Sequence, residues 1–350
     1  MKMKAVVLQE FGGVENFVDE QWQVTDPREN EVLVRVQAAS VNPVDFKTRK
    51  GYLGGEPPMV LGVDMAGVVE EVGDQVKDLR SGDEVYGFVD AEGPASNGAY
   101  AEYVTVPRSF LAPKPEGFSF PEAAALGMVG PTAYQCLIDK ARVRPGESVF
   151  IAGGSGAVGS IAIQLARYYE AGPILTTAGS RESIDYLARP LGISQEHIID
   201  YRHRSLTELH EAVIAANHGN PIACAFDFVG GDMKRLCCEV LDFDGRVTTI
   251  VEEDDDFRLY TVSGEKSPLL SRSASLHTQL LLARARFGSP PYWDIFAEEL
   301  ATLAKLVQQG HIQAHRILML EDFSAEAIAE AHTRLEEGHV NGKLVIPVAP

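Results

Sequence analysis

A glycine-rich loop is the part of this sequence whose residue types and spacing point most directly to chemistry. It follows the apolar run Val149–Ala152 and leads into an amphipathic helical pattern. Backbone N–H groups at a helix start can bind a pyrophosphate when no side chain blocks its approach, so glycines are suited to this position. The loop therefore predicts a dinucleotide-binding unit. Its predicted contact residues are Gly154, Gly156, Ala157, Val158 and Gly159.

Two kinds of strand pattern surround this loop. From residue 149 onward, apolar runs are each followed by polar or helical sequence, and this alternation is typical of a parallel sheet with crossover helices. From Lys4 to Gly87, short alternating runs are separated by Gly, Pro and Asp turns, which favours a partly open barrel. The predicted sheet strands are 149–152, 174–178, 223–229 and 245–251, and the predicted barrel strands are 5–9, 32–38, 67–72 and 84–88.

Other segments leave both patterns. A short helix is predicted over 43–50, because Pro43 suits a first helical turn and Gly51 suits its end. Near the C-terminus the strict alternation stops, and we expect this part to pack back on the N-terminal barrel. The elements predicted there are helices over 296–310 and 325–338 and strands over 316–320 and 343–347.

Length and charge limit the classes of function. A chain of 350 residues suits two domains. Its 31 basic and 50 acidic side chains give a net charge of −19, which disfavours nucleic acid and anionic membranes as partners. No apolar window is long enough for a membrane span, and the four cysteines lack the spacing of a zinc knuckle or a disulfide framework. We expect buried thiols in a cytoplasmic protein.

Several sequence blocks, in this order, resemble the medium-chain dehydrogenase/reductase superfamily, and within it the zinc-independent quinone and enone reductases. The resemblance implies an α/β protein with two domains. One is a doubly wound parallel (Rossmann) sheet that binds NADPH, over 125–292, and the other is a GroES-like, partly open β-barrel that carries catalysis, over 1–124 and 293–350. The blocks are 4–7, 40–51, 61–69, 82–87, 98–103, the glycine loop, Gly338 and 342–346.

The resemblance also concerns a metal. Zinc alcohol dehydrogenases of this superfamily place Cys, His and Glu around an open metal position. The matching segments here, 42–45, 62–64 and 127–129, have none of those ligands in place. His311 and His315 are spaced i, i+4 but are expected to be turn and strand residues. The expected chemistry is therefore hydride transfer, without a metal, to a carbon already activated in a quinone or an α,β-unsaturated carbonyl.

Four residues are the catalytic candidates that the resemblance implies. Asn42 would lie beside the nicotinamide and hold a carbonyl or ribose, or else be a turn residue before proline. Lys47 would stabilise developing enolate charge, or else be an exposed helical lysine. Tyr52 is one position away from a tyrosine proton donor of related enoyl reductases, and water is an alternative donor. Thr132 would lie beside the nicotinamide ribose, and would cap a helix N-terminus instead or in addition.

The choice of cofactor depends on the end of the second sheet strand. Ser180 and Arg181 stand where NAD enzymes place an acid, and both suit a 2′-phosphate, so NADPH is preferred. Ser183 replaces a phosphate-binding lysine of the relatives, and Glu182 leaves a ribose contact open. By resemblance, Tyr201 lies against the adenosine phosphate, and Arg202 adds positive charge there. The remaining cofactor contacts, for some of which packing alone is an equal explanation, are Phe228, Val229, Ile250, Val251 and Asn341.

The sequence thus predicts a homodimeric NADPH-dependent reductase of quinones or enones. Residues 274–282 are predicted to be an apolar edge strand that joins two subunits. Asp45 and Arg49, spaced i, i+4, are predicted to form a surface ion pair. Two alternatives stay open: an enoyl-thioester reductase of the same superfamily, and a non-catalytic NADPH-binding protein with a structural or regulatory role.

Overall fold

A computed structural model describes residues 1–90, 98–253, 267–338 and 340–348. The chain divides into two compact units, which we call the sheet unit and the barrel unit. The sheet unit is Thr132–Leu281, and the barrel unit joins Met1–Pro131 to Leu282–Pro350. Among the described residues, no helix combines the length and the apolar character needed to cross a membrane.

The sheet unit is built on six parallel strands in the order β11-β10-β9-β12-β13-β14. The order runs outward in both directions from β9, the strand that precedes the glycine loop, which is the arrangement of a doubly wound sheet. The predicted fold class is therefore confirmed. The strands are β9 Val149–Ala152, β10 Ile174–Ala178, β11 Ile198–Asp200, β12 Ile222–Asp227, β13 Leu241–Thr249 and β14 Ser275–Thr278.

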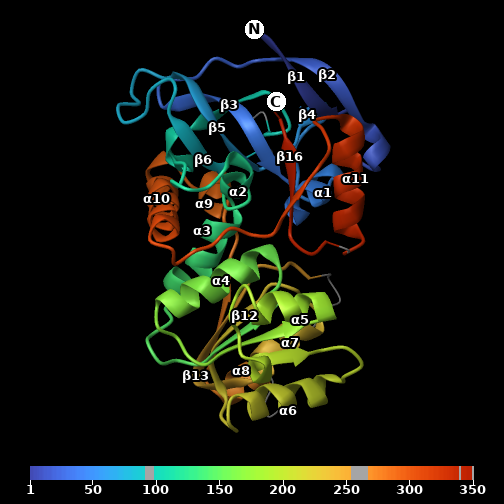
Figure 1. Cartoon of the computed structure of the whole chain (residues 1–350), viewed down its shortest axis with the longest axis vertical. Helices are drawn as coiled ribbons and strands as arrows, with labels where there is room; N and C mark the ends of the chain where they lie inside the picture. The colour runs from blue at the N-terminus through green and yellow to red at the C-terminus, as the bar shows by residue number, and fades with distance from the viewer. Residues whose placement is uncertain (91–97, 254–266, 339, 349–350) are drawn as a thin grey trace. The chain divides into compact units, whose positions relative to one another are not determined.

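Helices follow the strands as crossover connections (Figure 1). One buried cluster joins the strands to three of them, α6, α7 and α8, through residues such as Phe150, Val213, Leu236 and Leu269. All four cysteines are buried, as predicted. The helices are α3 Val129–Tyr134, whose residues from Thr132 onward belong to this unit, a π-helical turn Gln135–Lys140, α4 Ala157–Tyr168, α5 Arg181–Ala188, α6 Leu206–Ala216, α7 Asp232–Glu239 and α8 Pro268–Ser271.

The barrel unit contains a seven-stranded sheet in the order β15-β16-β3-β5-β6-β8, with β7 also paired to β3, and a three-stranded sheet β2-β1-β4. The larger sheet is β3 Glu31–Ser40, β5 Asp64–Val72, β6 Glu84–Phe88, β7 Tyr103–Pro107, β8 Leu111–Pro113, β15 Ile317–Met319 and β16 Lys343–Pro347; the smaller is β1 Lys2–Leu8, β2 Phe17–Gln23 and β4 Met59–Val60. The helices are α1 Pro43–Arg49, α2 Phe120–Ala124, α9 Ala283–Phe287, α10 Asp294–Gln308 and α11 Ala325–Glu336.

Both parts of the chain contribute to the larger sheet of the barrel unit. Strand β16 pairs antiparallel with β3, with Val345 opposite Ser40, and the Val41 N–H donates to the Leu344 carbonyl at 3.0 Å. This register brings Lys343 to the start of α1, immediately after β3. The C-terminal strand is thus part of the wall that positions Asn42.

Three sequence predictions are wrong in detail. Asp45 and Arg49 form no surface ion pair, because both are buried and each has a different partner. The edge strand predicted over 274–282 is only Ser275–Thr278. Thr132 lies inside α3 and not at a helix N-cap.

Candidate functional site

The backbone of the glycine loop in the sheet unit lies very close to neighbouring atoms of the protein. A Cβ on Gly154 would lie 2.0 Å from Thr176 Oγ1, and one on Gly159 would lie 2.2 Å from the Gly153 carbonyl oxygen. The Gly154 N–H donates to Thr176 Oγ1 at 3.1 Å, which ties the loop to β10. Gly156 is the N-cap of α4 and is exposed. The loop therefore leaves open the first turn of a helix whose free N–H groups suit an anion.

Buried Asp227, at the end of β12, organises the neighbouring strand ends. Its carboxylate accepts from the backbone N–H of Val229 at 3.1 Å, from that of Gly230 at 2.8 Å and from the Thr249 hydroxyl at 2.7 Å. The Val229 side chain lies against the glycine loop, because a Cβ placed on Gly153 would be only 2.8 Å from it. Val229 is nevertheless 52% exposed. An exposed apolar side chain at this edge of the sheet suits a flat ligand.

The residues predicted to select NADPH lie around the end of β10. Ser180 is the N-cap of α5, where its hydroxyl accepts from the Ser183 N–H at 3.0 Å and contacts the Ser183 hydroxyl. Arg181 follows it and is exposed. A Cβ placed on Gly179 would lie 2.1 Å from the Tyr201 hydroxyl, so Tyr201 also lies beside the end of β10.

Arg202 is less available than predicted. Its guanidinium donates to both oxygens of the Asp200 carboxylate, at 3.0 and 2.6 Å. This contact lowers the pKa of Asp200 to about 2. The positive charge that Arg202 adds near Tyr201 is therefore largely compensated.

The barrel unit contains a buried polar centre around Asp64, at the first residue of β5. One carboxylate oxygen accepts from the Ser40 hydroxyl at 2.6 Å and from Asn42 Nδ2 at 2.7 Å. The other accepts from the Met128 backbone N–H at 2.6 Å. Asp64 and Ser40 are fully buried, and Asn42 is 4% exposed.

Lys343 provides the positive charge of this centre. Its ammonium lies 3.3 Å from Asp64 Oδ2 and donates to Asn42 Oδ1, and the residue is only 3% exposed. Two buried opposite charges in contact, with their remaining hydrogen-bonding positions filled, can be retained in a core because the partners compensate for lost hydration. Asn42 is thus held between a cation and an anion.

Asp45 fixes the backbone of Asn42 through a hydrogen bond. Its carboxylate accepts from the Asn42 N–H at 2.7 Å, as the third residue of a capping box. Burial raises the pKa of Asp45 to about 7, and the nearby Asp64 carboxylate acts in the same direction. Next to it, the Tyr100 hydroxyl lies 3.2 Å from Nε2 of buried His332, whose pKa is lowered by burial to about 3.

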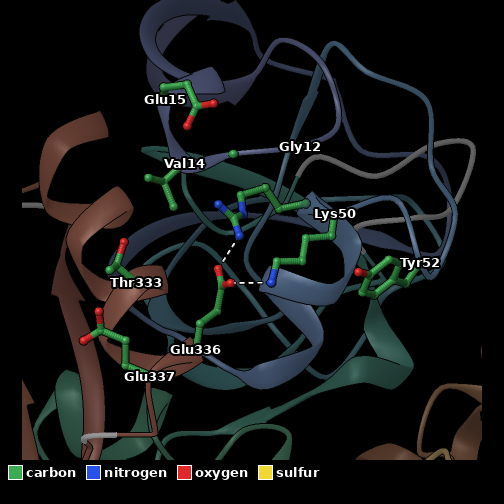
Figure 2. Close-up of a pocket in the computed structure, with 10 residues that line it drawn as sticks. Gly12, Val14, Glu15, Lys50, Tyr52, Thr333, Glu336 and Glu337 are labelled. Carbon is green, nitrogen blue, oxygen red and sulfur yellow. Dashed lines mark hydrogen bonds and ion pairs between the residues drawn. The ribbon is translucent and has the colours of Figure 1, made fainter. Parts of the chain in front are cut away.

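A cavity of about 670 Å³ opens beside the end of α1 and the end of α11 (Figure 2). Glu336 pairs there with buried Arg49 and with Lys50. Tyr52 lines the cavity and is 73% exposed. Lys47 is half-buried on α1. The exposure of Tyr52 leaves its hydroxyl free to reach a ligand or water.

Known proteins show similarity over both units. A model of the alcohol dehydrogenase GroES-like domain matches residues 28–116, and a model of the zinc-binding dehydrogenase family matches residues 194–346. A zinc-type alcohol dehydrogenase-like protein of Staphylococcus aureus is 30% identical over 332 residues, which is 92% of each chain. The chain belongs to the medium-chain dehydrogenase/reductase superfamily.

Two other members of the superfamily carry more specific names. The chloroplastic NADPH-dependent alkenal/one oxidoreductase of Arabidopsis thaliana is 39% identical over 216 residues, 59% of this chain. The chain spans about half the length of that relative, because the match covers 55% of it. A solved quinone oxidoreductase from Coxiella burnetii is 29% identical, with both chains fully covered and a TM-score of 0.78.

Some members of this superfamily bind zinc, and three segments of this chain match the segments that carry the ligands of that metal site. Asn42, Asp64 and Met128 come from the three segments that match the metal site, and they do converge. However, the Asp64 carboxylate is already filled by four donors, one of them the Lys343 ammonium. Among the described residues no group of three His, Cys, Asp or Glu could hold a metal ion. The donor set at Asp64 does not fit a metal.

The structure groups the predicted site residues by unit. In the barrel unit, Asn42 is the N-cap of α1 and Lys47 lies within that helix. Tyr52 follows α1, and Asn341 is exposed just before β16. In the sheet unit the glycine loop, Ser180, Tyr201 and Val229 lie at the carboxyl ends of β9, β10, β11 and β12. Phe228, Ile250 and Val251 follow β12 and β13, and the Ile250 N–H donates to the Asp227 carbonyl at 3.3 Å.

Sequence reasoning missed four polar residues that shape these groups. Ser40, Asp64 and Lys343 lie within recognised blocks but were assigned no role. Asp227 lies within the predicted strand 223–229 and is the last residue of β12 in the structure. An acidic residue that follows an apolar run is the local signal that could have marked this strand end. For Lys343 the only signal is a lysine that begins an otherwise apolar strand.

Proposed function

We propose that the chain is a zinc-independent, NADPH-dependent reductase that transfers hydride to quinones or α,β-unsaturated carbonyls. The observation that carries the proposal is the Asp64 centre, where an amide, a carboxylate and an ammonium stand in place of metal ligands. The names of the Arabidopsis and Coxiella relatives support the substrate class. The proposed functional division is 125–292 for cofactor binding, and 1–124 with 293–350 for catalysis.

The cofactor would be held by the sheet unit. The open first turn of α4, with Gly156, Ala157, Val158 and buried Gly154 and Gly159 around it, fits a pyrophosphate. When bound, a reduced nicotinamide supplies the hydride. Val229 and its neighbours Phe228, Ile250 and Val251 would contact the cofactor at the strand ends, and Thr132 and Asn341 are proposed ribose and nicotinamide contacts.

The barrel unit would act on the substrate. Asn42 would donate an amide N–H to the substrate carbonyl oxygen, where negative charge develops as the β-carbon is reduced. Lys47 would add positive charge near that oxygen. Tyr52, with its exposed hydroxyl, is the proposed source of the proton for the α-carbon, in competition with water.

A substrate panel tests the reaction. NADPH and NADH oxidation is measured with a series of quinones, enones and enoyl thioesters. We expect turnover of quinones or enones, with higher kcat/KM for NADPH. Preference for enoyl thioesters would replace the proposed substrate class, and binding of NADPH without any turnover would favour a non-catalytic role.

Arg181 tests the choice of cofactor. We propose that Arg181, Ser180 and Tyr201 contact the 2′-phosphate side of NADPH, with Arg202 as a weaker contributor because of Asp200. A charge-assisted hydrogen bond is worth about 1.5–3 kcal/mol, so Arg181→Ala should weaken NADPH binding by about tenfold or more and leave NADH unchanged. Arg189→Ala, at the exposed other end of α5, is the matched control. Equal losses for NADPH and NADH would contradict the assignment.

A further inference from the structure

Asn42 is the residue to which the proposed function gives the substrate carbonyl, yet its amide is surrounded by other groups of the protein. Oδ1 accepts from the Lys343 ammonium, and Nδ2 donates to Asp64 at 2.7 Å. The backbone N–H is taken by Asp45 at 2.7 Å. Of the two Nδ2 hydrogens, one is used by Asp64, and the described residues supply no acceptor for the other.

The two neighbours of opposite charge allow only one orientation of this amide. If the group rotated by half a turn, its NH2 would face the ammonium and its oxygen would face the carboxylate, and both contacts would be repulsive. Because Asn42 and both charges are nearly or fully buried, water cannot screen these interactions well. The remaining N–H is therefore fixed in direction before any ligand arrives.

Lys343 is held in place independently of Asn42. Its backbone N–H donates to the Arg316 carbonyl at 2.8 Å, and it pairs with Ile317 of β15. The neighbouring residue, Leu344, accepts from the Val41 N–H at 3.0 Å. Gly342 lets the strand approach, since a Cβ there would lie 2.4 Å from the Arg316 carbonyl oxygen. Strands on both sides thus fix the lysine that faces Asn42.

We propose that Lys343 is a positioning residue, whose buried ammonium, together with Asp64, locks the Asn42 amide so that its one remaining N–H is preorganised for the substrate oxygen. The use of that N–H rests on the proposed function, but the lock itself does not. Preorganised donors act where charge develops, so the lock is expected to affect kcat more than cofactor affinity. Lys343 itself touches neither substrate nor cofactor in this proposal.

A double-mutant cycle of Lys343→Met and Asn42→Ala tests the proposal. With NADPH and the best quinone or enone, Lys343→Met is expected to lower kcat at least tenfold and to change the NADPH Kd less than twofold. In the Asn42→Ala background the same change should lower kcat no further. Lys305→Met, on the exposed face of α10, is the lysine control and should keep kcat. Multiplicative losses of kcat, or wild-type kcat in Lys343→Met, would overturn the proposal.

A second variant guards against loss of folding. Lys343→Met leaves Asp64 buried without its cation, so Asp64→Asn with Lys343→Met removes both charges and restores a neutral core. This double variant is expected to recover the urea midpoint that Lys343→Met loses while kcat stays low. Recovery of kcat together with the midpoint would show a merely structural role.

Failure of the proposed function is distinguishable from failure of the lock. If the wild-type protein turns over no member of the panel, the proposed reaction is contradicted. The fixing of the Asn42 amide by Lys343 and Asp64 is then tested by urea unfolding alone. Coupled shifts of the urea midpoint for Asn42→Ala and Lys343→Met would support it. Additive shifts would overturn it.

Discussion

Asp45 is a carboxylic acid in a place that disfavours its charge. It is 1% exposed, lies near the Asp64 carboxylate, and has one oxygen with no hydrogen-bond partner. Its other oxygen accepts from the Asn42 N–H. A neutral acid can supply that acceptor as well as an ionised one, so the residue keeps its structural contact in the protonated form. The consequence is that this buried group makes the stability of the protein depend on pH.

The pKa of Asp45 rises on folding from 3.8 to about 7. The folded state therefore binds this proton more tightly than the unfolded state, and the free energy of unfolding falls as pH increases from about 4 to about 7. Asp45→Asn keeps an acceptor oxygen and removes the titration. Relative to wild type, the variant should gain stability between about pH 4 and about pH 7, by about 1.4 kcal/mol for each unit by which the pKa rises on folding. Urea unfolding at several pH values measures this.

Two buried histidines act in the opposite direction and serve as an internal reference. Burial lowers the pKa of His315 and of His332 to about 3, so the unfolded state binds more protons between about pH 3 and 6.5. Their contribution to stability rises with pH over that window, and it is present in wild type and variant alike. Parallel curves for wild type and Asp45→Asn would contradict the assignment of the slope to Asp45.

At the scale of elements, α1 is tied at both ends by charges that belong to distant parts of the chain. Its N-cap Asn42 contacts Asp64 and Lys343, and its last residue, Arg49, pairs with Glu336 at the end of α11. Lys50 shares the same carboxylate at the rim of the cavity in Figure 2. A helix of seven residues has little stability of its own, so these contacts decide its position.

Glu336 is expected to matter much more than Lys50. Glu336→Gln leaves the buried Arg49 guanidinium without a charged partner, and breaking such a pair costs about 3 kcal/mol or more. Lys50→Met removes a cation that is 35% exposed, and an exposed pair contributes at most about 1 kcal/mol. Free energies of unfolding for the two variants test the difference. Similar, small decreases in the free energy of unfolding for both variants would show that the pair between Arg49 and Glu336 does not stabilise the protein.

Elements whose limits are marked locally were predicted well. Strands β9, β10, β6 and β16 have the predicted bounds. Each is a short, mainly apolar run that directly follows a Ser, Pro, Asp or Gly residue, and β9 and β10 are also followed by Gly. Burial of individual side chains was not predictable in this way. Asp45 and Arg49 have the spacing of an exposed helical pair, but Arg49 meets Glu336 at a separation of 287 residues.

In the candidate site, too, features marked in the local sequence were predicted and contacts between distant residues were not. The glycine loop was recognised because its residues are adjacent in sequence and their order is set by one strand and one helix. The Asp64 centre needs Lys343, which is 301 residues from Asn42 and arrives only through the pairing of β16 with β3. Nothing in the local sequence of either residue specifies that register.

At the scale of the whole molecule, the open edge of the parallel sheet is the feature that bears on assembly. Strand β14 is the last strand of its sheet, pairs with β13, and has Leu276 37% exposed. An edge strand with exposed apolar side chains can pair with a second copy of itself. The homodimer predicted from the sequence remains our proposal for this edge, with a shorter strand than expected.

Leu276→Lys tests that proposal. Two-fold pairing would bring the introduced charges together, so the variant should be monomeric by light scattering at micromolar concentration while wild type is dimeric. Leu270→Lys, on α8 and 52% exposed, adds the same charge outside β14 and should leave the dimer intact. A monomeric wild-type protein, or a dimer in Leu276→Lys, would contradict assembly through β14.

The pairing of β16 with β3 has a consequence for how the chain is made. The sheet unit is one continuous stretch, so it can be completed while synthesis continues, whereas the barrel unit waits for residues 343–347. Until that strand emerges, the Asp64 carboxylate has no cation to accompany it into the core. The barrel unit, whose synthesis begins before that of the sheet unit, is therefore completed after it, and its closure depends on β16.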